Sequence, residues 1–189
     1  IGDEAVATGV RAIAAAARVC GIEAVVAARH RLDHVEMIDE SLIIEMARLG
    51  VTASVQPAFD ALWGGDDGLY VQRLGRERAE TMNPFAAMAR AGVVLAFGSD
   101  SPVTPLDGWG MVRAAVGHHT FSSRLSPRGA FSAATRGGWR AAGIDDAGAL
   151  APGMLATFAV WEVDGELVVE APDERVASWS TDPRAGVPG

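Results

Sequence analysis

The sequence predicts an α/β fold in which helices alternate with the strands of a parallel sheet. Segments with apolar residues every three to four positions alternate with short apolar runs. The run at 93–97 is continuously apolar, as expected for a strand that is buried on both faces. After Leu150 the pattern changes from helical to extended. We therefore expect one core over residues 1–148 and a separate C-terminal segment over residues 149–189.

The first half of the chain contains two predicted helices and two predicted strands. The first helix should end at Gly21. The second should follow the polar residues Asp39 and Glu40 and run to Leu49. Strands are predicted over 24–34 and 51–55 from their apolar runs. The Gly- and Asp-rich stretch 63–68 predicts a long connection, which is either a lid or a solvent-exposed excursion without a role.

The second half continues the alternation and then changes character. Helices are predicted at 85–91, 107–120 and 127–142, the last with Ser126 as its N-cap. Extended segments at 157–163 and 166–170 flank an Asp-Gly pair, which is typical of a β-hairpin turn.

Composition restricts the class of protein. The net charge is −8 and no stripe of basic residues is present, which argues against a nucleic-acid partner. No window approaches the roughly 20 consecutive apolar residues of a membrane span, and no signal peptide is evident. A single cysteine, Cys20, excludes an internal disulfide and is expected to be buried on a helix. A cytoplasmic protein that acts on small molecules is the expectation.

Asp100 is the first candidate functional residue. The apolar run at 93–97 leads directly into Gly98-Ser99-Asp100, so this carboxylate is expected at the carboxyl end of a buried strand. In parallel α/β barrels the chemistry gathers at those ends, which favours a catalytic group beside a metal. An acid that caps a helix or closes a turn is the alternative interpretation.

His34 is the second candidate. Period-two alternation places His30, Leu32 and His34 on one face of a strand, with His34 last before the loop. A hydrogen-bonded structural histidine is the alternative for such a residue taken alone. Two candidate ligands at equivalent strand ends favour a metal site over two unrelated structural roles.

Several motifs in order resemble the amidohydrolase superfamily of metal-dependent hydrolases, in the branch called amidohydrolase family 3. The resemblance covers nearly the whole chain and rests on the segments Ile1–Val6, Arg31–His34, Ser54–Pro57, Phe97–Val103 and Leu150–Ala156. It implies a (βα)8 TIM-type barrel with a small accessory β-domain built from both chain ends. This chain resembles the C-terminal half of that barrel, and its hairpin would belong to the accessory domain.

The same resemblance implies roles for individual residues. His34 would end the sixth barrel strand and Asp100 the eighth, both facing the metal centre, and Asp100 would also be catalytic. Gln56 would close the seventh strand, where it either lines the pocket or holds a loop. Asp33 stands where glutamate is commoner in the family, and Thr157 where aspartate is usual.

The family's remaining ligands are a His-x-His pair, a further histidine and often a carboxylated lysine or another bridging ligand. None is present here, and the chain has no lysine. Because the sequence starts at Ile1 directly before a helix, we expect a preceding strand and these ligands in a longer protein.

The expected chemistry is hydrolysis of an amide or another C–N bond in a small molecule. A divalent metal, with zinc as the expected ion, lowers the pKa of bound water to about 7, and one or two ions would serve the intact enzyme. Asp100 would pass the proton from water to the leaving nitrogen. A catalytic zinc typically has about three protein ligands, whereas two candidates are present, so we expect the chain alone to be inactive.

A function from another class remains open, namely a non-catalytic α/β binding or assembly module derived from a barrel half. A half barrel leaves sheet edges unpaired, which predicts a homo-oligomer or pairing with the missing N-terminal half. Adjacent His118 and His119 would point about 100° apart on a helix, which favours surface or interface roles over a shared metal. Arg31 is expected to form a structural ion pair.

Overall fold

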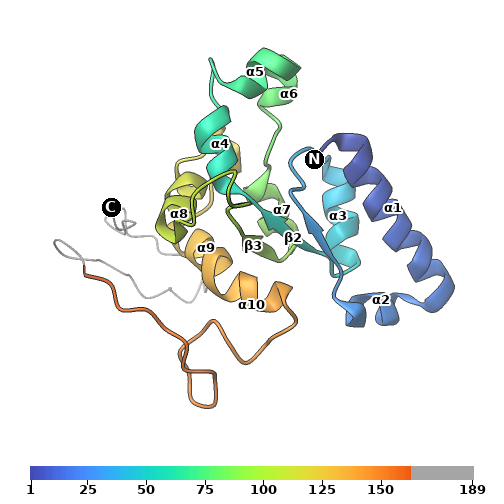
Figure 1. The fold of residues 1–189 in the computed structure, drawn as a ribbon. Coiled ribbons are helices and arrows are strands. Elements are labelled where there is room, and N and C mark those ends of the chain that lie inside the picture. Colours follow the sequence, from blue (N-terminus) through green and yellow to red (C-terminus); the bar gives the residue numbers. More distant parts are fainter. Residues whose placement is uncertain (163–189) are drawn as a thin grey trace.

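The computed structural model describes residues 1–162, and within them three parallel strands form one sheet (Figure 1). The strands are β1 (Arg31–Asp33), β2 (Thr52–Val55) and β3 (Leu95–Phe97), in the order β1-β2-β3. In register, Leu32 lies opposite Ala53, and Ala53 lies opposite Leu95. Because the strands are parallel, their carboxyl ends all lie at one edge of the sheet. The predicted α/β class is confirmed.

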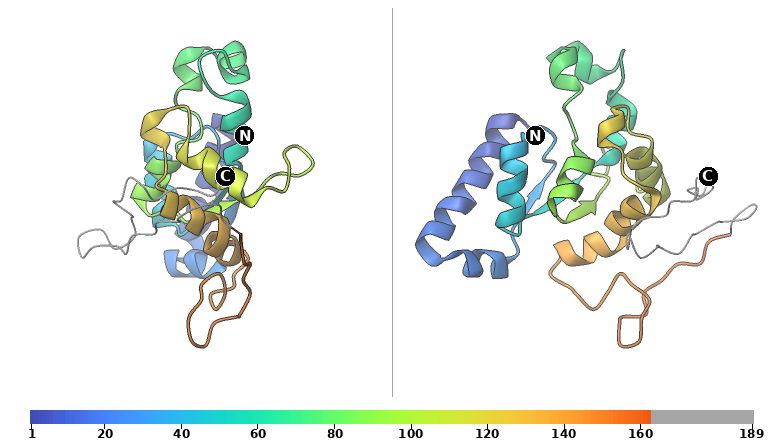
Figure 2. Two further views of the ribbon diagram at one scale, coloured as in Figure 1. Left: turned by 90° about the vertical axis from the view of Figure 1, so that its left-hand side faces the viewer. Right: turned by 180° about the vertical axis from the view of Figure 1, so that it is seen from behind.

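Three helices make up the N-terminal part: α1 (Asp3–Cys20), α2 (Ile22–Ala28) and α3 (Glu40–Arg48). The helices α1 and α3 lie side by side in the views of Figures 1 and 2. Asp39 caps α3, because its carboxylate accepts a hydrogen bond from the backbone N–H of Leu42 at 2.9 Å. The Cys20 side chain is exposed at the end of α1, so its predicted burial is wrong.

The predicted strand over 24–34 is wrong in its first part, because residues 22–28 form α2. Gly21, at φ +90°, ends α1 and redirects the chain, so that α2 packs back onto α1. Val25 is 2% exposed and Val26 is 42% exposed, which is one-sided burial of a helix. Arg29, at φ +54°, ends α2 before the short β1. Tertiary packing overrides the strand propensity of the two valines.

Three short helices follow β2 that were not predicted: α4 (Pro57–Trp63), α5 (Leu69–Leu74) and α6 (Arg76–Ala79). Pro57 occupies the first turn of α4, where its missing N–H costs nothing. A small buried cluster of Phe59, Tyr70 and Met82 joins these helices to the rest of the molecule. The connection at 63–68 is confirmed between α4 and α5, and its role as a lid stays a prediction.

The predicted helix at 85–91 is observed as α7 (Phe85–Ala91), whereas α8 (Gly108–Val116) stops at Gly117 and is shorter than predicted. A 3-10 turn, η1 (Phe121–Ser123), follows. The predicted helix at 127–142 is divided into α9 (Pro127–Ser132), the π-turn η2 (Ala133–Gly137) and α10 (Gly138–Ala141).

The start of this divided helix is as predicted, because Ser126 Oγ accepts a hydrogen bond from the N–H of Gly129 at 3.1 Å. The π-turn brings Gly137 against β3, where a Cβ on Gly137 would lie 2.1 Å from the carbonyl oxygen of Leu95. The close approach of helix and strand therefore requires glycine here.

The main core lies between the sheet and the helices and is built from residues such as Val10, Met46, Val55, Phe85 and Met88, all at 0% exposure. No helix in the described part of the chain is long and apolar enough to cross a membrane.

The predicted hairpin is not seen where it can be checked, because residues 157–162 contain no strand. Its second segment, 166–170, lies outside the described residues, and the division at 148/149 stays a prediction.

Candidate active site

Three polar side chains follow the three strands at the carboxyl edge of the sheet: His34 after β1, Gln56 after β2 and Asp100 shortly after β3. The hydrogen bonds between neighbouring strands extend to the carboxyl ends of the strands. The N–H of His34 donates to the Ser54 carbonyl at 2.7 Å, and the N–H of Gly98 donates to the Val55 carbonyl at 3.0 Å. The structure therefore brings the two predicted metal-side residues to one edge of one sheet, on either side of β2.

Both predicted residues adopt left-handed backbone conformations, His34 at φ +71° and Asp100 at φ +53°. Residues with a Cβ rarely adopt this region, and the cost is roughly 1–3 kcal/mol for each. Such strain persists where the surrounding structure holds it, and it clusters at functional sites. The turn after Asp100 contains a cis peptide bond between Ser101 and Pro102.

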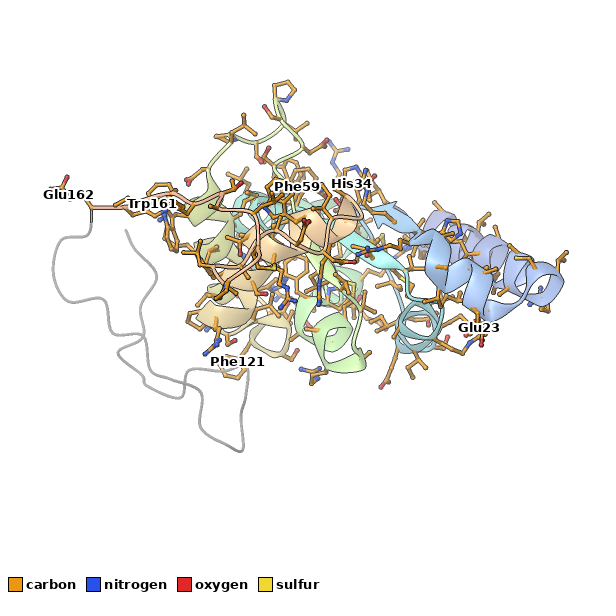
Figure 3. The ribbon with its side chains drawn as sticks, turned by 90° about the horizontal axis from the view of Figure 1, so that it is seen from below. Glu23, His34, Phe59, Phe121, Trp161 and Glu162 are labelled. Atoms are coloured by element: carbon orange, nitrogen blue, oxygen red, sulfur yellow. The ribbon has the colours of Figure 1, made fainter. Side chains whose placement is uncertain are left out.

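The His34 imidazole is half-buried and has a nitrogen without a partner. Its Nδ1 is buried and makes no hydrogen bond within the described structure, and Glu36 Oε1, at 3.9 Å, is too far to accept one. The ring stacks on Phe59 at 6.1 Å between centroids, and Figure 3 shows the two side by side. Buried polar atoms are normally paired, so this nitrogen is free to bind a partner from outside the described residues.

The neighbouring Glu36 is already engaged by another residue. It is 4% exposed and accepts a hydrogen bond from the Tyr70 hydroxyl at 2.9 Å. Burial, together with the Glu36 charge, raises the pKa of Tyr70 well above its ordinary value. Tyr70 is therefore a neutral donor to Oε2 of Glu36, and the other oxygen, Oε1, is the one nearest to His34.

Gln56 and Asp100 present uncommitted oxygens at the same edge. Gln56 is 6% exposed, and its Oε1 has no hydrogen-bond partner among the described residues. This oxygen therefore holds no loop within the described residues, and pocket lining by Gln56 stays a prediction. Asp100 is exposed, while Ser99 holds the turn by accepting hydrogen bonds from the Ser101 N–H and the Thr104 hydroxyl.

A second polar cluster, centred on Asp60 of α4, was missed by the sequence analysis. Asp60 is 4% exposed, and its Oδ2 lies 2.9 Å from the His119 backbone nitrogen and 3.1 Å from His119 Nδ1. Its Oδ1 lies 3.4 Å from His118 Nε2. Asp60 and His119 are 59 positions apart, so no local signal could have joined them.

Surface or interface roles are expected for His118 and His119, but His118 is 1% exposed and does not lie at the surface of the described structure. The two residues follow α8 in non-helical chain, so the helical angle between neighbours does not apply. His118 Nδ1 accepts the Thr120 N–H at 3.0 Å, and burial lowers the pKa of the ring. His118 is therefore a neutral, buried residue that packs edge-on against Phe85.

Two further observations limit the chemistry of the site. Residues 1–162 contain no group of three or more His, Cys, Asp or Glu side chains placed to hold a metal ion. Arg31 Nε lies 3.0 Å from Asp33 Oδ1, which confirms the predicted structural ion pair.

Comparison with known proteins identifies the family. A model of the Amidohydrolase family matches residues 1–181. The chain belongs to this family. The imidazolonepropionase of Ruegeria pomeroyi is 34% identical over 137 residues, which are 69% of this chain and 29% of that protein. The putative amidohydrolase YtcJ of Bacillus subtilis is 34% identical over 89 residues, which are 47% of this amidohydrolase-family chain and 16% of that protein.

Two solved structures resemble the family member described here. An uncharacterized metal-dependent hydrolase from Pyrococcus furiosus has a TM-score of 0.64 and 27% identity, covering 78% of this chain and 29% of that chain. An uncharacterized metal-dependent hydrolase from Pyrococcus horikoshii OT3 has a TM-score of 0.59 and 30% identity, and the match covers 67% of this chain and 27% of that chain. The amidohydrolase-family chain thus spans less than a third of the length of these relatives.

Proposed function

We propose that this chain forms the C-terminal half of a (βα)8 barrel in a metal-dependent hydrolase that cleaves amide or other C–N bonds of small molecules. The observation that carries the proposal is the position of His34 and Asp100 after two strands of one parallel sheet, at its carboxyl edge. Barrel enzymes build their active sites at that edge. Family membership and the likeness to two metal-dependent hydrolases support the same reaction class.

The donor atoms at this edge are of the kinds that bind a divalent metal. The unpartnered Nδ1 of His34 and the exposed carboxylate of Asp100 are nitrogen and oxygen donors of the kinds that zinc accepts. We assign these two side chains to the metal. When bound, zinc would supply Lewis-acid activation of water and of the scissile carbonyl.

The chain's own residues would handle the proton and orient the substrate. The Asp100 carboxylate accepts a proton from the attacking water and returns it to the leaving nitrogen, as a general base and then a general acid. The unpartnered Oε1 of Gln56, on the strand between the two metal-side residues, accepts a hydrogen bond from a substrate N–H. Phe59 keeps the His34 ring in place by stacking.

Zinc titration of the chain tests whether His34 and Asp100 share an ion. The variants are His34→Asn, Asp100→Asn and the double variant, measured by calorimetry. Each single variant should weaken zinc binding by about tenfold or more, because a ligand is lost. The loss of zinc affinity in the double variant should be much smaller than the product of the losses in the two single variants. The reason is that both residues bind the same ion, so removing the second costs little once the first is gone.

The matched controls are His30→Asn, at the amino end of β1, and Asp67→Asn, in the connection before α5, both exposed residues. Neither should change zinc affinity by more than about twofold, since substitutions of uninvolved surface residues have small effects. Independent effects of His34→Asn and Asp100→Asn would contradict a shared site. Tight stoichiometric zinc together with amide hydrolysis by the isolated chain would contradict the expectation from the sequence that this chain is inactive alone.

The proposal includes pairing with another chain through the sheet edges. Just before and just after β1, the backbone groups of His30 and His34 bond to β2, so those of Arg31 point away from β2. Just after β3, the backbone N–H of Gly98 bonds to β2, so the backbone groups of Phe97 point away from β2 on the opposite side of the sheet. Unpaired edges of this kind favour association with a second copy or with the rest of the barrel. Light scattering should show a dimer or a larger species. A stable monomer across the micromolar range would contradict this part of the proposal.

The non-catalytic binding or assembly module is the second candidate, and the described residues favour it in one respect. They supply only two assigned metal donors and no group of three. The zinc titration separates the two candidates, because a module derived from a barrel half has no reason to place His34 and Asp100 on one ion.

A further inference from the structure

A cavity of about 830 Å³ lies beside α7, at the amino end of β3. Its walls are residues of α7, the residues that lead into β3, and the segment that runs from Arg124 through α9 and η2 to α10. Figure 1 shows where these elements lie in the fold. Five arginines line it: Arg90, Arg124, Arg128, Arg136 and Arg140. We call it the arginine cavity.

The charge in this cavity runs against that of the whole chain. The sequence has 24 acidic and 16 basic residues, yet no described Asp or Glu lines the arginine cavity. The segments 84–95 and 124–141 contain all five of these arginines and no acidic residue. All five arginine side chains are exposed, so water and salt screen their repulsion, but an anion placed among them would be attracted by several guanidinium groups at once.

Some of these guanidinium groups are committed to other contacts, and others are not. Arg124 donates from Nε to the His118 carbonyl at 2.8 Å and lies over the Phe121 ring. Arg136 and Arg140 lie close enough to influence Asp145, but Arg29 already holds both oxygens of that carboxylate at 2.8 Å. Arg90 on α7 and Arg128 on α9 form no ion pair with a carboxylate in residues 1–162.

We propose that the arginine cavity binds a small molecule with two or more clustered oxyanion groups, either phosphates or carboxylates. The planar guanidinium fork matches both groups by paired N–H donors. Apolar residues between the arginines, among them Ala86, Val93 and Leu125, offer a surface for the carbon skeleton of the ligand. The volume lies within the range of about 300–1,000 Å³ that is usual for small-molecule sites.

This site is separate from the proposed active site. The arginine cavity opens at the amino end of β3, whereas Asp100 follows the carboxyl end of the same strand. A molecule bound in the arginine cavity is therefore not the substrate of the proposed active site at His34 and Asp100. The inference does not depend on the proposed function.

Calorimetry of the full chain with pyrophosphate and with citrate, at constant ionic strength, tests the proposal. The chain should bind at least one of them at a single site. The double variant Arg90→Gln/Arg128→Gln should bind the same probe at least about tenfold more weakly, because it loses the hydrogen bonds from two charged guanidinium groups to the oxyanions. The double variant Arg18→Gln/Arg73→Gln changes the net charge equally at exposed positions on α1 and α5, and should bind within about twofold of the wild-type chain.

The two probes distinguish the sources of the oxyanions. Binding of pyrophosphate alone assigns a phosphate ligand, binding of citrate alone a carboxylate ligand, and binding of both a site that accepts either group. The absence of saturable binding to both probes would overturn the proposal. An equal loss in the two double variants would also overturn it, because binding would then follow net charge and not this cavity. The urea midpoints of both variants report that the fold is intact.

Discussion

The Asp100→Asn variant is expected to lower kcat by about 10²–10⁴-fold in the longer protein that contains this chain, because positioned general acid–base catalysis contributes that much. The amide of asparagine keeps the size of the side chain and cannot accept the proton of the attacking water. The measurement is kcat on the substrate that the wild-type protein hydrolyses, first without added zinc and then with zinc in excess. Zinc content is measured in parallel, because Asp100 is also assigned to the metal.

The control is Asp67→Asn, which removes an exposed carboxylate from the connection between α4 and α5. This variant should keep kcat within about twofold of the wild type, since substitutions of uninvolved surface residues have small effects. Full activity of Asp100→Asn would remove that residue from the reaction. A loss of activity that excess zinc restores would leave Asp100 a metal ligand and remove its role in proton transfer.

The Phe85→Ala variant should lower the free energy of unfolding by about 3–5 kcal/mol, the usual cost of removing a large buried ring. Phe85 is 0% exposed and lies between Phe97, at 6.3 Å between ring centroids, and His118, at 5.4 Å. Truncation leaves a cavity between the sheet and the segment after α8. Urea denaturation of the chain measures the change.

The matched control is Phe121→Ala, since Phe121 is 81% exposed and Figure 3 shows it at the outside of the molecule. This variant loses only the contact with Arg124 and should cost less than about 1 kcal/mol. An equal cost for the two variants would contradict the assignment of Phe85 to the core.

The Phe85 variant should also change the pH dependence of stability. Burial lowers the pKa of His118 in the folded chain, so below about pH 6.5 the unfolded state binds more protons and stability falls as the pH falls. In Phe85→Ala, water reaches the ring, its pKa returns towards the ordinary value, and this fall becomes shallower. The change in urea midpoint between pH 7.5 and pH 5, measured for the wild-type chain and for Phe85→Ala, tests whether the fall in stability becomes shallower.

Much of the candidate site could be predicted because its signals are local. The apolar run before Asp100 and the alternation up to His34 indicate strand ends, and parallel strands share one edge. The strand expected over 24–34 failed for a different reason. Whether Val25 and Val26 form a strand or a helix depends on what lies beside them, and here α2 packs against α1.

The Asp60 cluster and the arginine cavity could not be predicted. Each joins residues that are distant in sequence, and burial is a property of their common surroundings. His118 is buried only because α4 and Phe85 close over the segment that follows α8. The arginines at 90 and 128 belong to different helices, and only the folded chain places them on one cavity.

By itself, the sequence determined the alternation of helices and strands, the family, and the placing of His34 and Asp100 after strands, because periodicity, caps and motifs act over a few residues. Only the tertiary structure decided the length of β1, the π-turn that seats Gly137 on β3, the buried state of His118 and the gathering of five arginines. These features arise from contacts between distant segments, whose free energies are decided by packing and desolvation and are not written in any local pattern.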